Sequence, residues 1–112
     1  MTKVEAIIRP DKLEAIKEEL EKIGHSGITK TEVEGHRKQK GITEQFRGKE
    51  YRLTFIPKVK VEIVIKDSDV EKTIDAIVKI AYTGQIGDGK IFVSDIKDVV
   101  RVRTKERGET AL

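Results

Sequence analysis

Two segments of the chain alternate apolar and polar residues in the way that half-buried β-strands do. Val4, Ala6 and Ile8 share one face of residues 3–9 (KVEAIIR), and apolar residues occupy every odd position from 59 to 65 in residues 58–66 (KVKVEIVIK). β-Branched residues predict further strands at 28–34 (ITKTEVE) and 90–94 (KIFVS), and residues 98–103 (DVVRVR) predict a short fifth one or an extension of the preceding one.

Apolar residues spaced three and four apart predict two helices. The first begins at Pro10, whose missing N–H suits the first helical position, and ends near Gly24. The second begins at Ser68, which forms a capping box with Glu71, and ends at Gly84. Their apolar stripes comprise Leu13, Ile16, Leu20 and Ile23 in the first helix and Val70, Ile74, Ile77, Val78 and Ala81 in the second.

The resulting order is β-α-β, a long connection, and β-α-β. Right-handed crossovers onto one antiparallel sheet predict an α+β fold, the ferredoxin-like split βαβ (βαββαβ) sandwich, as a single domain over residues 1–112. The helices cover one face of the sheet, and the other face is either solvated or covered by self-association. That open face carries Glu5, Ile7, Arg9, Lys58, Lys60, Glu62 and Val64.

The connection between the two halves, residues 35–57, has weak secondary-structure signals. Long irregular loops within compact domains are uncommon and are usually functional or disordered. This connection is too apolar for a plain linker, so we expect it to become ordered against another surface. Its apolar residues are Phe46, Tyr51, Leu53, Phe55 and Ile56.

Composition excludes several classes of protein. The 112 residues, of which 37% are hydrophobic, suffice for one core. The absence of cysteine excludes a disulfide framework, a zinc finger and a cysteine nucleophile. No apolar run approaches the ~20 residues of a membrane span, and no secretion signal is evident, so a cytoplasmic location without membrane insertion is expected.

The formal net charge of +3 is distributed unevenly. Residues 35–57 contain six basic and two acidic residues, and residues 101–112 contain four basic and two acidic ones. These segments therefore carry +4 and +2, and the rest of the chain carries −3. Two local basic segments, rather than a polycationic surface, indicate discrete anionic or protein partners.

Residues 83–90 (TGQIGDGK) have the glycine and lysine spacing of a phosphate-binding P-loop. Ile91 stands where a P-loop has Ser or Thr, and the segment connects a helix to a strand instead of a strand to a helix, so a P-loop is excluded. What remains is a glycine-rich turn. It is either purely structural or a nest of backbone N–H groups for an anion, with Lys90 at its end.

Arg101 and Arg103 alternate on the predicted fifth strand, so both guanidinium groups are expected on one side. Such a pair suits a polyphosphate, and ion pairs with glutamates of the sheet are the alternative. The fold is expected to bring this pair together with Lys38, Lys58 and Lys90 around an anionic small molecule.

No Ser-His-Asp arrangement or carboxylate pair accompanies these cations, so the predicted role is binding and not catalysis. His25 and His36 are far apart in the sequence, which disfavours a metal site. Nucleic-acid binding is disfavoured as well, because no aromatic residue is expected on the open sheet face to stack bases.

Separated segments resemble the PII nitrogen-regulatory signal-transduction family of GlnB and GlnK type. The strongest is TGQIGDGKIFV at 83–93, accompanied by FRGKEY at 46–51, VEAIIRP at 4–10, IPKVKVEIV at 56–64 and VVRVRT at 99–104. The resemblance covers the whole chain and implies a non-enzymatic homotrimer in which ATP and ADP compete for sites between subunits. It divides the domain into a T-loop at about 36–55, a nucleotide-binding turn at about 83–90 and a C-terminal loop at about 102–112.

The resemblance also implies which residues form each site. ATP or ADP is expected to contact Thr29, Lys38, Glu62, Val64, Gly87, Asp88, Gly89 and Lys90, with Arg101 and Arg103 from the neighbouring subunit. With MgATP bound, 2-oxoglutarate is expected near Gln39, Lys40, Gly41 and Lys58, and Gln39 is expected to help coordinate Mg²⁺. The T-loop is expected to dock through Arg47 on a target such as an ammonium transporter, which would recruit the protein to the membrane. Tyr51 matches the family's uridylylation site.

The chain departs from the family pattern at the base of the loop, where Arg37 and Lys38 replace the usual Gly and Arg. Phe46 replaces a Tyr, and Lys49 replaces a small residue. Because Arg37 lacks the conformational freedom of glycine, the turn that approaches 2-oxoglutarate is affected. Three alternatives stay open: an adenine-nucleotide sensor with another second ligand, a slow ATP-hydrolysing enzyme, and an adaptor that uses the loop without ligands.

Overall fold

The computed structural model describes the backbone of residues 1–40 and 51–112 and the side chains of residues 1–36 and 55–112. Its strands are β1 (Thr2–Ile8), β2 (Thr29–Lys40), β3 (Tyr51–Ile65) and β4 (Lys90–Asp95), and its α-helices are α1 (Leu13–Lys22) and α2 (Val70–Ala81). Short 3-10 turns lie at Pro10–Lys12, Asp67–Asp69 and Gly108–Ala111.

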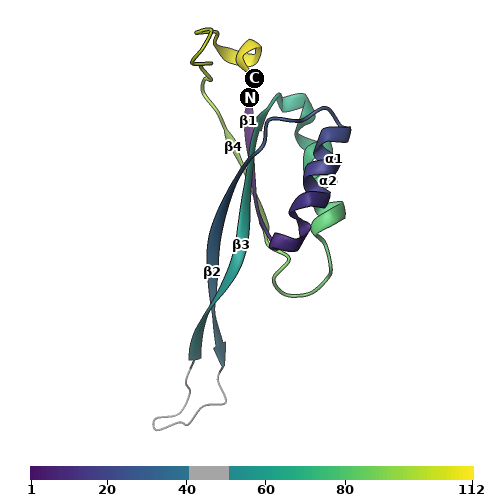
Figure 1. Cartoon of the computed structure of the whole chain (residues 1–112), viewed down its shortest axis with the longest axis vertical. Helices are drawn as coiled ribbons and strands as arrows, with labels where there is room; N and C mark the ends of the chain where they lie inside the picture. The colour runs from purple at the N-terminus through teal and green to yellow at the C-terminus, as the bar shows by residue number, and fades with distance from the viewer. Residues whose placement is uncertain (41–50) are drawn as a thin grey trace.

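One antiparallel sheet joins the strands in the order β2-β3-β1-β4. Both helices lie on the same side of this sheet (Figure 1). The strands with the clearest alternation, β1 and β3, occupy its centre, because Val4, Ala6 and Ile8 of β1 and the odd positions 59–65 of β3 form one buried apolar face. The predicted α+β fold is confirmed.

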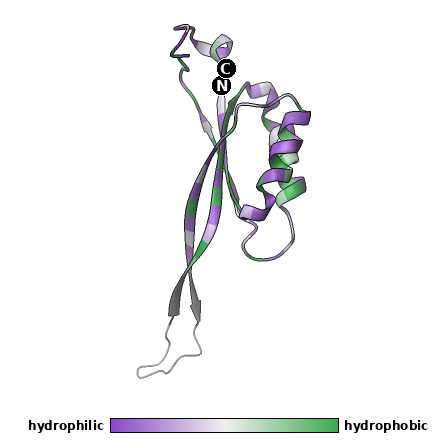
Figure 2. Cartoon of the chain, in the orientation of Figure 1, coloured by the Kyte–Doolittle hydropathy of each residue, from purple (hydrophilic) through white to green (hydrophobic). Residues whose placement is uncertain are grey.

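The core lies between the helices and the sheet, and it is built from the side chains that the alternation selects. Val59, Val61, Ile63 and Ile65 of β3 are at most 6% exposed. They pack with alternate residues of β1 and with one stripe of each helix, while α1 presents mainly hydrophilic residues to the viewer (Figure 2). The helical residues buried in this cluster are Ile16, Leu20, Ala76, Ile77 and Ala81.

Both α-helices begin later than predicted. Pro10 opens a 3-10 turn, and α1 starts only at Leu13. Ser68 likewise lies inside a 3-10 turn, and the N-cap of α2 is Asp69, which makes no side-chain capping hydrogen bond. The predicted capping box is therefore wrong. Because 3-10 turns are tight connectors, they carry the chain from a strand end onto the helical layer before the α-helix starts.

The connection at 35–57 was predicted without regular structure, and the structure corrects this. β2 continues to Lys40 and β3 begins at Tyr51, with pairing that runs from Gly35 opposite Ile56 to Lys40 opposite Tyr51. The two strands form a ribbon that extends past the helices (Figure 1). The far end of β2 has the sequence HRKQK at 36–40, in which no alternating apolar residue marks a buried face, so the hydrophobic pattern does not predict this part of the strand.

The predicted fifth strand at 98–103 is wrong. Val100 forms only an isolated bridge with Arg107, and the chain turns at residues 102–104. The turn is closed by backbone hydrogen bonds from Lys105 to the carbonyl of Arg101 at 2.8 Å and from Arg101 to the carbonyl of Glu106 at 3.0 Å. The tail from Thr104 is thus hydrogen-bonded back onto residues 98–101.

We expect Ile16→Ala to lower the free energy of unfolding by about 2–5 kcal/mol, because Ile16 is fully buried and its truncation leaves a cavity. Its neighbour Lys17 is exposed, so Lys17→Ala should change the value by less than about 0.5 kcal/mol. Urea denaturation of both variants at one protein concentration measures this. Equal effects of the two substitutions would contradict the assigned core.

Candidate functional site

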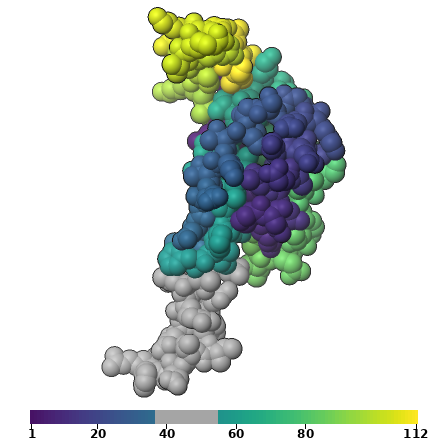
Figure 3. All heavy atoms as spheres, in the orientation of Figure 1, coloured from purple at the N-terminus to yellow at the C-terminus, as the bar shows by residue number. Residues whose placement is uncertain are grey.

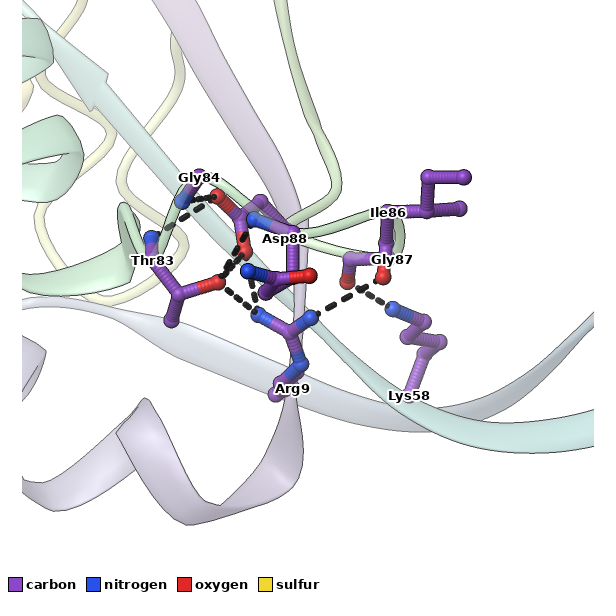
Figure 4. A network of polar contacts seen from close by, with 8 residues as sticks. Arg9, Lys58, Thr83, Gly84, Ile86, Gly87 and Asp88 are labelled. Carbon is purple, nitrogen blue, oxygen red and sulfur yellow. Dashed lines mark hydrogen bonds and ion pairs between the residues drawn. The ribbon is translucent and has the colours of Figure 1, made fainter.

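The glycine-rich turn between α2 and β4 is organised by one carboxylate, that of Asp88 (Figure 4). Its Oδ2 accepts hydrogen bonds from the backbone N–H groups of Thr83 at 2.8 Å and Gly84 at 2.9 Å, and its Oδ1 accepts one from the Thr83 hydroxyl. Arg9, directly after β1, donates to the same Oδ1 and, at 3.1 Å, to the carbonyl of Ile86. Asp88 therefore closes the turn on itself and fastens it to the end of β1.

These contacts determine the protonation of Asp88. The hydrogen bonds from the Thr83 hydroxyl, from the Thr83 N–H and from the Arg9 guanidinium hold the pKa of Asp88 far below its ordinary value of 3.8. The carboxylate is ionised at neutral pH, and its oxygens are committed to the turn. We therefore assign the side chain of Asp88 to the construction of the turn.

The glycines of the turn are required by its backbone. Gly87 and Gly89 have φ values of +104° and +100°, which residues with side chains rarely adopt. A Cβ atom on Gly89 would lie 1.7 Å from the carbonyl oxygen of Ile7, because β4 begins directly beside β1. The turn thus lies against the sheet at a distance that only glycine permits.

Lys58 reaches the turn from β3 and donates a hydrogen bond to the carbonyl of Gly87 (Figure 4). Beside this contact lies an open groove of about 470 Å³, whose lining includes Arg9 and Lys58. The structure therefore brings together Lys58 and Gly87, which the sequence assigned to two neighbouring ligands. The full lining is Arg9, Pro10, Asp11, Ile56, Pro57, Lys58, Ile86 and Gly87.

Arg9 is the residue of this site that the sequence reasoning missed. It was placed on the open sheet face but not among the ligand residues. Its position between a strand and a proline could be read from the sequence, but its partner Asp88 is 79 residues away. Only the return of the chain through α2 brings the two together.

A second group of predicted residues lies together on the open face. Thr29 pairs with Glu62 across β2 and β3, and both line a groove of about 260 Å³ with Val64. Lys60 Nζ and Lys3 Nζ lie 3.6 and 3.9 Å from carboxylate oxygens of Glu62. Leu112, at the end of the tail, also lines this groove.

The single chain does not gather the five predicted cations. Lys38 lies on β2 five residues beyond Val33, the partner of Lys58, which is roughly 16 Å along the strand. The tail that carries Arg101 and Arg103 follows the end of β4 that is opposite to Lys90. Figures 1 and 3 show the tail at one end of the body and the 82–89 connection at the other.

Other predicted residues lie partly or wholly outside what the structure describes. Gln39 and Lys40 continue β2, and Tyr51 begins β3, so their backbones are placed but not their side chains. Gly41 and Arg47 lie outside the described residues.

Arg101 is held by the tail itself, which corrects the expectation that it shares the side of a strand with Arg103. Its guanidinium lies 3.0 Å from Oε1 of Glu106 and donates to the backbone oxygens of Leu112 at 3.1 Å and Thr110 at 3.4 Å. The predicted alternative, an ion pair with glutamate, thus applies to Arg101, although Glu106 belongs to the tail and not to the sheet.

The open face does carry an aromatic residue, contrary to prediction. Phe92 of β4 stands opposite Glu5 and is 52% exposed. The pairing of β4 with β1 puts Phe92 on the same face as Glu5. A single ring is still fewer than the sheet aromatics with which RNA-binding modules stack two or three bases.

The two histidines serve separate local contacts. His25 Nε2 lies 3.0 Å from the hydroxyl of Thr73, which donates its one proton to the carbonyl of Asp69 at 2.8 Å, so His25 is the donor of that pair. His36 packs its ring near Phe55. Among the described side chains, no group of three or more His, Asp or Glu is placed to hold a metal ion. In the described ranges 1–40 and 51–112, no helix has the length and apolarity to cross a membrane.

Known proteins are similar to this chain in sequence, and solved structures are similar to it in fold, over most of their length. A family model described as "Nitrogen regulatory protein P-II" matches residues 1–106. The proteins named nitrogen regulatory protein P-II of Azospirillum brasilense and P-II 1 of Escherichia coli are 54% and 50% identical over 112 residues, with all of both chains covered. The chain belongs to the nitrogen regulatory protein P-II family, whose members are named as regulators.

Solved structures agree with this assignment. The complex of Bacillus subtilis GlnK with ATP is similar at a TM-score of 0.88 and 38% identity, covering 99% of this chain and 96% of that one. Arabidopsis thaliana PII bound to citrate is similar at a TM-score of 0.80 and 44% identity, covering 98% of this chain and 87% of the plant protein.

We expect Gly89→Ala to destabilise the protein by at least about 2 kcal/mol, because its Cβ would overlap the Ile7 carbonyl and its φ is positive. Gly27→Ala is the matched control, since a Cβ there meets nothing within 4 Å. Thermal and urea unfolding measure both. Similar stabilities of the two variants would refute the close approach of the turn to β1.

The lowered pKa of Asp88 predicts a pH dependence of stability. The contribution of this carboxylate is present above its unfolded pKa, near 3.8, and is lost as pH falls below that value toward the lower folded pKa. Asp88→Asn should therefore destabilise the protein at neutral pH and lose less stability than the parent between about pH 6 and about pH 3. Urea midpoints at both pH values test this, with exposed Asp75→Asn as the control; parallel pH profiles of parent and Asp88→Asn would contradict it.

Proposed function

We propose that this protein is a non-enzymatic, homotrimeric sensor that binds ATP or ADP competitively and binds 2-oxoglutarate together with MgATP. It would operate in the cytoplasm and act on partner proteins through the T-loop, residues about 36–55. Membership of the P-II family and the ATP complex of a similar GlnK support this proposal.

The observation that carries the proposal is the separation of complementary groups within one chain. The turn that ends at Lys90 presents a fixed glycine backbone, but Arg101 and Arg103 follow the opposite end of β4. Arginines suit the phosphates of a nucleotide held by such a turn. A neighbouring copy that supplies them would complete the site, which is why we propose a trimer with nucleotide between subunits.

Within each subunit, the remaining nucleotide contacts would come from two regions. Gly87, Gly89 and Lys90 would contact the phosphates, with Asp88 fixing their backbone and Lys38 approaching from β2. Thr29, Glu62 and Val64, which share a groove on the open face, would surround the adenosine.

A dicarboxylate such as 2-oxoglutarate would bind in the groove beside the turn. Lys58 and Arg9 place an ammonium and a guanidinium group there, and a similar plant PII is bound to citrate, another carboxylate ligand. Gln39, Lys40 and Gly41 would complete this site, and Gln39 would help to hold Mg²⁺. Because Lys38 is roughly 16 Å along β2 from the row of Lys58, the far ribbon would have to bend toward the turn.

This movement supplies a mechanism for signalling. MgATP with 2-oxoglutarate would favour the bent arrangement of the loop, and ADP would favour another, through their different affinities for the two states. The loop would dock on a target through Arg47, with an ammonium transporter as the proposed class of partner and membrane recruitment as the consequence. A uridylyl group on Tyr51 would block docking by its bulk and charge.

Isothermal titration calorimetry with ATP and ADP, each with and without Mg²⁺ and 2-oxoglutarate, tests the proposal. ATP and ADP should displace each other, and 2-oxoglutarate should bind only with MgATP. Lys90→Ala should weaken nucleotide binding roughly 10- to 100-fold, as expected for a lost charged contact, and exposed Lys17→Ala should leave it unchanged.

The alternatives predict different results. Absence of nucleotide binding at millimolar concentration would overturn the sensor. ATP binding without any effect on 2-oxoglutarate would indicate another second ligand and implicate Arg37. ATP turnover well above about one per minute would favour an enzyme. If ATP and ADP do not change the affinity for the partner, in the parent or in Lys90→Ala, the adaptor is favoured.

A further inference from the structure

The tail forms hydrogen bonds with the side chain of Arg101 but not with that of Arg103. Arg101 is bound by Glu106, Thr110 and Leu112. Arg103 is exposed and makes no hydrogen bond or ion pair with any residue that the structure describes. Two arginines that look equivalent in the sequence therefore differ in their readiness to accept an anion.

The contacts with the tail occupy the Nη1 and Nη2 atoms of Arg101, through which a guanidinium binds a phosphate. A guanidinium binds two phosphate oxygens through a pair of N–H donors. The pair is either Nη2 with Nε or Nη2 with Nη1. Nη2 of Arg101 donates hydrogen bonds to the backbone oxygens of Thr110 and Leu112, and Nη1 is paired with Glu106. Both donor pairs include Nη2, so neither is available to a phosphate while the tail holds Arg101.

The tail also contacts the face that carries the predicted adenosine residues. Leu112, whose backbone oxygen accepts a hydrogen bond from Arg101, lines the groove that contains Thr29, Glu62 and Val64. Ala111 beside it is buried. Release of Arg101 therefore frees a guanidinium and loosens one wall of this groove in the same movement.

We propose that the segment 105–112 is an internal competitor for Arg101, with Glu106 as its charged contact, so that the phosphates of a bound nucleotide must displace it. This rests on the proposed nucleotide-binding function and adds a regulatory element to it. The Arg101–Glu106 pair is half-exposed, with side chains 37% and 42% accessible, so the competition is weak enough for a ligand to reverse.

The test is a comparison of ATP and ADP affinities by calorimetry. Glu106→Ala should tighten binding roughly two- to fivefold, the range expected for removal of an exposed ion pair. Glu109→Ala removes the same charge from the same tail, but the Glu109 side chain makes no ion pair among the described residues, so its affinity should match the parent.

A double-mutant cycle identifies the residue through which Glu106 acts. The gain from Glu106→Ala should persist in an Arg103→Ala background and vanish in an Arg101→Ala background. A gain that persists without Arg101, or no gain in the parent, would overturn the proposal. Glu106→Gln provides the same comparison if the alanine variant does not fold.

Inorganic tripolyphosphate separates this inference from the proposed function. If the parent protein binds no adenine nucleotide, the proposed function fails. Tripolyphosphate should nevertheless bind more tightly to Glu106→Ala than to the parent, and only when Arg101 is present. Failure of tripolyphosphate to bind either protein would overturn the competition.

Discussion

The contact between the start of β4 and the end of β1 is the constraint on which the site depends. Gly89 passes so close to the carbonyl of Ile7 that no side chain fits between them. The Asp88 carboxylate then draws together the Thr83 end of the turn and the Arg9 end of β1. A short loop with several glycines would otherwise have many conformations, and these contacts reduce them to one that presents a fixed backbone beside Lys58.

Several charged side chains of the molecule form ion pairs within the protein, so the net charge does not show which of them can bind a ligand. Asp88 and Arg9 neutralise each other within the turn, and Glu62 lies between Lys3 and Lys60 on the open face. Arg101 is engaged by Glu106, whereas Arg103 is exposed. The surplus of positive charge in the sequence is thus a set of local arrangements, some of which are already satisfied by the protein itself.

Two segments that lie outside the core between the helices and the sheet behave differently. The β2–β3 ribbon is held by its backbone ladder beyond the helices. The tail has no ladder and instead closes on itself through the Arg101 guanidinium and backbone hydrogen bonds. Neither arrangement depends on a hydrophobic core, so a ligand or partner can alter either one without unfolding the domain.

The sequence by itself determined the core and the order of the main elements, because burial on one face imposes a period of two on β1 and β3 and of 3.6 on the helices. It also identified the glycine-rich turn, whose spacing is local. The tertiary structure decided what local patterns do not contain: the ribbon, the closed tail in place of a fifth strand, and the pairing of Arg9 with Asp88. These depend on backbone pairing and on contacts between residues distant in the chain, and hydrophobic periodicity predicts neither.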